Sequence, residues 1–265
     1  MIELVDVRLD HPGGGSPLVA DATFTVARGE IALVIGAAGV GTSRLVAAAL
    51  GEAVTGRGRI EVFGRDVAKL RRASLRLLRR RIGIVPQDLC LLDDRSAQLN
   101  VVLPLEIDGI PRSMSVVRAA AILGQLGLDS EASLPIDCLS MSARQRVAVA
   151  RALVREPELV IADHPTSWQD AAGAELVAGA LMGAAAAGAS CLVFGRDPAL
   201  REIAEREGWR MLAIVDGRVL PLAEIALAGA AIDELLADNR SAPVRPDSED
   251  ESLPNVLPFP TAGVA

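Results

Sequence analysis

A glycine-rich stretch that begins at Gly36 has the residue types of a phosphate-binding loop. It follows an apolar, β-branched run at 31–35 and precedes an Ala/Leu-rich stretch that continues to Leu50. Glycines between a strand and a helix let backbone N–H groups face an anion without intervening side chains. The spacing fits G-x-x-x-x-G-K-[ST] except at the lysine, which is Thr42 here. The predicted phosphate-contacting residues are Gly36, Ala37, Ala38, Gly39, Val40, Gly41, Thr42, Ser43 and Arg44.

A second chemical feature is Asp163, which follows four apolar residues at 159–162. A buried strand that ends in an aspartate can bring a carboxylate to a metal ion beside a phosphate loop, where the hydroxyl of Ser43 would also be a ligand. The alternative is an aspartate that only caps a turn. The two features together, in an alternating α/β pattern, favour a nucleotide site.

Several elements must position these residues. Period-two alternation or buried apolar runs predict strands at 2–9, 22–26, 31–35, 59–63, 82–85, 159–162, 211–215 and 218–220, the last two joined at Asp216-Gly217. Helical stretches are predicted at 70–81, 113–126 and 143–154. The uncharged run 177–194 is interpreted as an Ala-rich helix and a buried strand split by Gly188, because Ala and Gly drive membrane insertion weakly.

Three further motifs, in order along the chain, resemble those of ABC ATPases. Residues 80–88, RRIGIVPQD, resemble the Q-loop region and contain Gln87; residues 139–153 resemble the signature helix, with LSGGE-QQR become LSMSA-RQR; and residues 163–170, DHPTSWQD, resemble the Walker B and D-loop stretch DEPTGNLD. The resemblance implies an α/β fold. It would be an ABC-type P-loop NTPase nucleotide-binding domain with an N-terminal antiparallel β subdomain, a mixed or parallel core sheet and a helical subdomain.

Within that superfamily the sequence resembles the FtsE cell-division family, through LLDDRS at 91–96, NVVLPL at 100–105 and the pair Asp108-Gly109. The lipoprotein-release and peptide-export families share much of this pattern, and an active exporter ATPase is the alternative. The resemblance implies a subunit at the cytoplasmic face of the bacterial inner membrane. It would bind an FtsX-like integral membrane protein, through which it contacts the membrane, and would form a head-to-tail homodimer.

The resemblance also implies ATP or ADP with Mg²⁺ as the ligand. Ser43, Gln87 and Asp163 would hold the metal, and Ser140 in the signature motif would face the nucleotide of the other copy. The chain departs from the family at Thr42, at His164 in place of a catalytic glutamate, at Arg196 in place of the switch histidine, and at 141–143 in the signature. We therefore expect a scaffold with little or no hydrolysis.

Two side chains, Arg44 and His164, could compensate for the groups that the site has lost. Arg44 is expected to face away from the phosphates, because successive helical residues point about 100° apart, although it could swing toward them. His164 has a side chain that titrates near neutrality and could act as a base. A mixed dimer with an ordinary ABC subunit is a further alternative.

Composition and charge limit the remaining predictions, which concern partners and domain boundaries. A net charge of −7 argues against a nucleic-acid partner. The family resemblance covers 1–221, with the helical subdomain at about 88–139, followed by a possible helix at 222–236 and a disordered tail at 237–265 that is rich in Pro, Ser, Asp and Glu. The basic stretch 71–81 is interpreted as a solvated helix face, with anionic lipid as the alternative partner.

Overall fold

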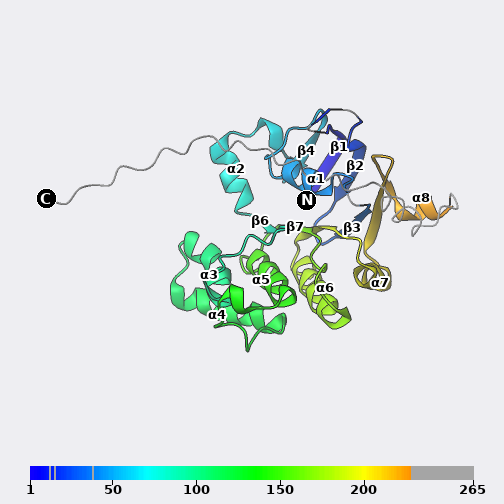
Figure 1. Cartoon of the computed structure of the whole chain (residues 1–265). Helices are drawn as coiled ribbons and strands as arrows, with labels where there is room; N and C mark the ends of the chain where they lie inside the picture. Colours follow the sequence, from blue (N-terminus) through cyan, green and yellow to red (C-terminus); the bar gives the residue numbers. More distant parts are fainter. Residues whose placement is uncertain (12, 15, 38, 228–265) are drawn as a thin grey trace, which may run out of the picture.

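The computed structural model of the chain describes residues 1–227 except 12, 15 and 38 (Figure 1). Ala38, one of the predicted phosphate-contacting residues, therefore lies outside the described residues. So do the tail at 237–265 and most of the possible helix at 222–236, of which the structure describes α8 (Leu222–Leu227).

The described strands form one ten-stranded sheet with the order β5-β4-β1-β2-β10-β9-β3-β8-β7-β6. β1 pairs antiparallel with β2 and β4, whereas β3, β6, β7, β8 and β9 form a parallel block. The strands are β1 (Ile2–Leu9), β2 (Val19–Val26), β3 (Ile31–Gly36), β4 (Arg57–Val62), β5 (Arg65–Asp66), β6 (Ile82–Val85), β7 (Leu159–Asp163), β8 (Ser190–Phe194), β9 (Arg210–Val215) and β10 (Arg218–Pro221). The predicted antiparallel N-terminal part and parallel core are confirmed.

The helices separate into groups around the sheet (Figure 1). They are α1 (Thr42–Ala49), α2 (Arg72–Arg79), α3 (Ala97–Ile107), α4 (Arg112–Gln125), α5 (Met141–Leu153), α6 (Ala171–Ala186), α7 (Pro198–Arg206) and α8. In Figure 1, α3, α4 and α5 lie together, and α6 and α7 lie beside them. One buried cluster packs α3–α6 against the parallel strands, and a second fills the space between α1 and the antiparallel strands.

The uncharged run 177–194 folds as predicted. Residues from 177 onward belong to α6, which ends before Gly188, and β8 follows with all five of its residues buried. Gly188 has φ 98°, a left-handed conformation that glycine adopts without strain. Among the described residues, no helix has both the length and the apolar character needed to cross a bilayer.

Two helices, α3 and α7, were not predicted from the sequence. α3 contains Pro104, which predicts a break, and its apolar residues are not confined to one face. Proline removes one intrahelical hydrogen bond, but α3 buries Val101, Val102 and Leu105 in the core, and this tertiary packing maintains the helix. α7 was not predicted either, although its sequence carries two local start signals, a cap at Asp197 that accepts from the Ala199 N–H at 2.8 Å and a proline in its first turn.

Candidate nucleotide site

The glycine-rich loop connects β3 to the N-terminus of α1, as predicted. Gly41 caps α1 with φ 97°, and an added Cβ there would lie 2.9 Å from the Cβ of Leu18. At Gly36 an added Cβ would lie 2.6 Å from Cγ2 of Val40. At Gly41 the short distance combines with a left-handed φ, so the loop requires glycine there, whereas a side chain at Gly36 would force the Val40 methyl group to move. The loop thus presents its backbone at the amino end of a helix, where anions are stabilised.

Three oxygen-bearing side chains converge beside this loop. The Ser43 hydroxyl donates to Oδ2 of Asp163 at 2.7 Å and lies 3.4 Å from Oε1 of Gln87. Asp163 ends β7 and is only 4% exposed, yet its Oδ1 has no hydrogen-bond partner. A buried carboxylate oxygen without a partner is costly, and Mg²⁺ prefers oxygen ligands. The three residues predicted as metal ligands therefore fit a Mg²⁺ ion.

The loop lines a cavity of about 230 Å³. Its walls combine the loop with three residues from distant segments, and they are Gly36, Ala37, Gly39, Gly41, Thr42, Ser43, Arg44, Gln87, His164 and Arg196. The structure thus brings most of the predicted residues together. Val40, Ser140 and Asp163 do not line this cavity, although Asp163 reaches it through its hydrogen bond to Ser43.

The guanidinium of Arg44 was expected to face away from the phosphates, and Arg44 is among the residues that line the cavity. Its orientation toward a bound phosphate stays a prediction. The 100° rotation between successive residues matters less in the first turn of a helix. Side chains there tilt toward the helix N-terminus, so all first-turn residues can approach an anion held near the helix axis.

His164 and Arg196 line the cavity from segments far from the loop in the sequence. His164 directly follows β7 with φ 54°, and its Nε2 is 3.9 Å from Oδ1 of Asp163, beyond hydrogen-bond distance. Burial lowers the pKa of His164 and Arg196 lowers it further, while Asp163 acts in the opposite direction. The imidazole is therefore neutral near pH 7.

Ser140 has a structural role within its own chain. It caps α5 by accepting a hydrogen bond from the Ala143 N–H at 3.2 Å. A contact between Ser140 and a nucleotide would have to come from a second copy, so its predicted role across a dimer stays a prediction.

Sequence analysis missed the role of Gln145, which links α5 to the loop after β7. The Gln145 side chain is buried; its Nε2 donates to the His164 carbonyl at 2.8 Å, and its Oε1 accepts from the Trp168 N–H at 3.0 Å. Gln169 then donates from Nε2 to both Gln145 and the Ser142 carbonyl. The signature helix and the segment that carries His164 are therefore one hydrogen-bonded unit. In the sequence, a glutamine among the apolar residues of the helix at 143–154 could have indicated a buried polar contact.

Asn100, which belongs to the segment that resembles FtsE, also holds backbone in place. It is buried, accepts from the Leu92 N–H at 2.8 Å, and donates to the carbonyls of Leu92 and Ser96 at 3.1 and 3.0 Å. The two segments that carry the narrower resemblance are thus coupled to each other by one side chain. At Asn100, therefore, the pattern has a role in local folding, and this residue does not by itself indicate a division role.

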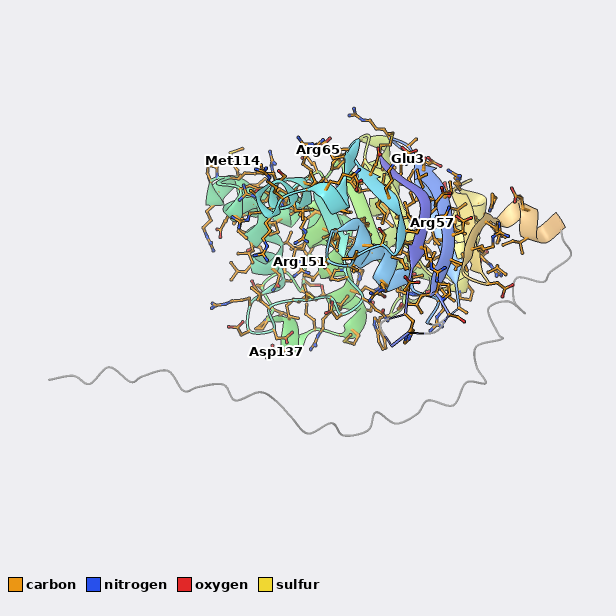
Figure 2. The ribbon with its side chains drawn as sticks, turned by 90° about the horizontal axis from the view of Figure 1, so that it is seen from above. Glu3, Arg57, Arg65, Met114, Asp137 and Arg151 are labelled. Carbon is orange, nitrogen blue, oxygen red and sulfur yellow. The ribbon has the colours of Figure 1, made fainter. Side chains whose placement is uncertain are left out.

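A second, wider groove of about 790 Å³ opens on the other side of Ser43 and Gln87. Its lining includes Val46, Leu50, Ile84 and Pro86, which are apolar, with Arg151 among them. Arg151 donates to the carbonyls in segment 89–90, whose two residues both have positive φ. Figure 2 labels Arg151 on α5, together with Met114 on α4 and Glu3 on β1.

A glycine cradle at a strand-to-helix turn, with a serine and a strand-end aspartate beside it, defines a P-loop nucleotide-binding protein. Comparison of the sequence narrows this class, because residues 19–167 match the family described as ABC transporter. The chain belongs to the ABC transporter family.

Individual relatives are consistent with this family. The methionine import ATP-binding protein MetN of Brucella abortus (strain 2308) is 38% identical over 170 residues, which cover 64% of this chain and 46% of the relative. MetN of Caulobacter vibrioides is 37% identical over 170 residues, covering 64% of this chain and 51% of that protein. The chain therefore spans about half the length of the curated relatives that it matches.

Solved structures agree with the fold. The dimeric ATP-binding cassette MJ0796 in a post-hydrolysis state, bound to ADP and Pi, superposes with a TM-score of 0.74 at 25% identity, covering 83% of this chain and 96% of that one. These comparisons confirm the ABC family and its fold. They do not support the narrower resemblance to FtsE, because the two relatives named above are methionine import proteins.

Proposed function

We propose that this chain is the nucleotide-binding subunit of an ABC transport complex and that it binds ATP or ADP with Mg²⁺ at the phosphate loop. The observation that carries the proposal is the contact between Ser43 and Asp163, with Gln87 beside them, directly next to a backbone cradle that only glycine can form. Nucleotide would meet backbone N–H groups, and Mg²⁺ would meet the three side-chain oxygens and neutralise phosphate charge.

The same site supports weak hydrolysis or none. Thr42 offers no charge to the phosphates, and a preorganised charge at that place contributes much of the stabilisation in phosphoryl transfer. His164 is neutral near pH 7 and able to accept a proton, but a lowered pKa makes it a weaker base. We therefore propose that the subunit acts chiefly by binding nucleotide.

The partners follow from the family. We propose that residues 1–221 form the nucleotide-binding domain, that the helical region at about 88–139 is its subdomain, and that an integral membrane subunit docks in the groove of about 790 Å³. The groove supports this because its lining is largely apolar and it reaches Ser43 and Gln87. A head-to-tail dimer would place Ser140 of one copy at the loop of the other. The subunit would be peripheral, at the cytoplasmic face of a bacterial inner membrane.

The kind of complex is a separate question. Relatives named for methionine import favour a transporter. An FtsE/FtsX-like division complex is the second candidate, supported by the segments 91–96 and 100–105, although Asn100 in the second segment has a structural role in holding the first. Export of lipoprotein or peptide is a transport alternative within the first candidate.

Nucleotide binding and turnover measured on one preparation test the proposal. Calorimetry with MgATP and MgADP is combined with phosphate release, using Ser43→Ala as the variant and Ser130→Ala, at an exposed position, as the control. We expect binding that depends on Ser43 and little phosphate release. No binding by the unmodified chain contradicts the proposal, and rapid Ser43-dependent turnover contradicts its non-hydrolysing part.

The complex itself can be identified by cross-linking. Cys90 is exposed and lines the groove, so a thiol-directed cross-linker should capture the membrane subunit through Cys90 and lose it in Cys90→Ser. Cys138, which is also exposed, provides a control position. A captured permease supports transport, and a captured FtsX-like protein supports the division candidate.

A further inference from the structure

Two arginines of the cavity at the phosphate loop have no acidic partner among the residues that the structure describes. Arg44 and Arg196 both line it, and none of its described lining residues is acidic. Nε of Arg44 is buried without any hydrogen-bond partner. A guanidinium N–H removed from water without an acceptor is costly. Nε of Arg146 lacks a partner as well, so it is the position of Arg44 in the cavity lining that makes an anion the expected acceptor for its guanidinium.

Two other arginines of the chain each form a two-hydrogen-bond ion pair with a carboxylate. Arg81 donates twice to Glu158 at 2.6 Å, and Arg206 donates twice to Glu175 at 2.8 and 2.9 Å. The chain as a whole has a net charge of −7, so carboxylates are abundant. Arg146 and Arg151 donate instead to backbone carbonyls. Within the part of the chain that the structure describes, Arg44 and Arg196 have neither kind of acceptor, although both line the cavity. Asp163, the nearest buried carboxylate, is instead bound to Ser43.

The two arginines approach the cavity from different elements. Arg44 belongs to the first turn of α1, and Arg196 lies in the loop between β8 and α7, close enough to His164 to lower the pKa of that imidazole. An anion held at the N-terminus of α1 would thus have a guanidinium on two sides. Thr42, where a P-loop lysine would stand, offers only a hydroxyl.

We propose that Arg44 and Arg196 together supply the positive charge that Thr42 does not, so that the site still binds nucleoside di- and triphosphates. This inference rests on the proposed nucleotide site and concerns how the site holds phosphate. Guanidinium groups suit the task because they bind phosphate oxygens in pairs of hydrogen bonds. In this chain the positive charge would come from residues 44 and 196 in place of a lysine at residue 42. Nucleotide binding is then preserved, but the geometry that the lysine would give is not restored.

Binding of MgADP to the full chain, followed by calorimetry, tests the inference. Arg44→Ala and Arg196→Ala should each raise Kd by about tenfold or more, as the loss of a hydrogen bond to a charged group implies. Arg118→Ala, on the exposed face of α4, is the matched control and should leave Kd unchanged. Thr42→Lys added to Arg44→Ala should recover part of the lost affinity. Unfolding midpoints without nucleotide show whether each variant is folded.

Salt provides an independent readout. Each arginine that contacts phosphate should contribute to the weakening of binding by salt, so Arg44→Ala and Arg196→Ala should show a shallower dependence of Kd on NaCl concentration than the unmodified chain. If the unmodified chain binds MgADP and both variants bind it equally well, the inference is overturned while the proposed function stands. If the unmodified chain binds no nucleotide, both are overturned.

Discussion

Asp163→Asn should separate stability from metal-dependent binding. Asp163 is 4% exposed, its Oδ2 accepts from Ser43 at 2.7 Å, and its Oδ1 has no partner. Asparagine has the same shape and can still accept from Ser43, but it carries no charge. The substitution therefore removes a buried charge that the chain alone does not neutralise.

The magnitude follows from two opposing terms. Removing the unneutralised charge should stabilise the nucleotide-free chain, while the new amide N–H₂ lacks a partner just as Oδ1 does, which cancels part of the gain. We expect a net gain of about 1 kcal/mol in the free energy of unfolding, which raises the unfolding midpoint by about 3 °C for a domain of this size. Mg²⁺ should lose a charged ligand, so the stabilisation by MgADP over ADP alone should disappear.

Thermal unfolding with no ligand, with ADP and with MgADP measures both effects. Asp93→Asn, at an exposed position, is the matched control and should change neither midpoint nor metal dependence. A midpoint lowered by several degrees without ligand would show that the carboxylate stabilises the fold. An undiminished difference between ADP and MgADP would refute its assignment as a metal ligand.

Three further predictions concern the surroundings of the site. Burial lowers the pKa of His164 below its ordinary 6.5, so the unfolded chain binds the proton at a higher pH than the folded chain, and stability falls as pH drops below about 6.5. His164→Asn should reduce this fall, measured as the change in denaturant midpoint between about pH 7.5 and 5.5. An equal change in the variant and the unmodified chain would contradict the prediction. Arg151→Lys keeps the charge but loses the paired donation to the carbonyls of segment 89–90, so the backbone amides of that segment should exchange hydrogen for deuterium faster, as measured by mass spectrometry. Unchanged exchange would show that the segment does not depend on these hydrogen bonds. Gly36→Ala should distort the loop and weaken nucleotide binding more than Gly179→Ala, where an added Cβ meets nothing within 4 Å; equal affinities would contradict the cradle geometry.

Local sequence signals predicted most of the strands and the framework of the site. The strands 2–9 and 82–85 were predicted at their observed bounds because alternation and apolar runs are local properties. The hairpin at Asp216-Gly217 also forms, with both residues at positive φ. α3 was not predicted, because its proline is a local signal for a break and only packing against the core overrides it.

The sequence by itself determined which residues could touch a phosphate or a metal ion, because glycine spacing, a hydroxyl and a strand-end carboxylate are chemical properties of the chain. Only the tertiary structure decided their geometry. It brings Ser43 to 2.7 Å from Asp163 across 120 residues, ties the His164 carbonyl to the buried side chain of Gln145, and places Arg44 in the lining of the cavity at the phosphate loop. Such contacts depend on the order of strands in the sheet and on the direction of first-turn side chains, and local patterns record neither.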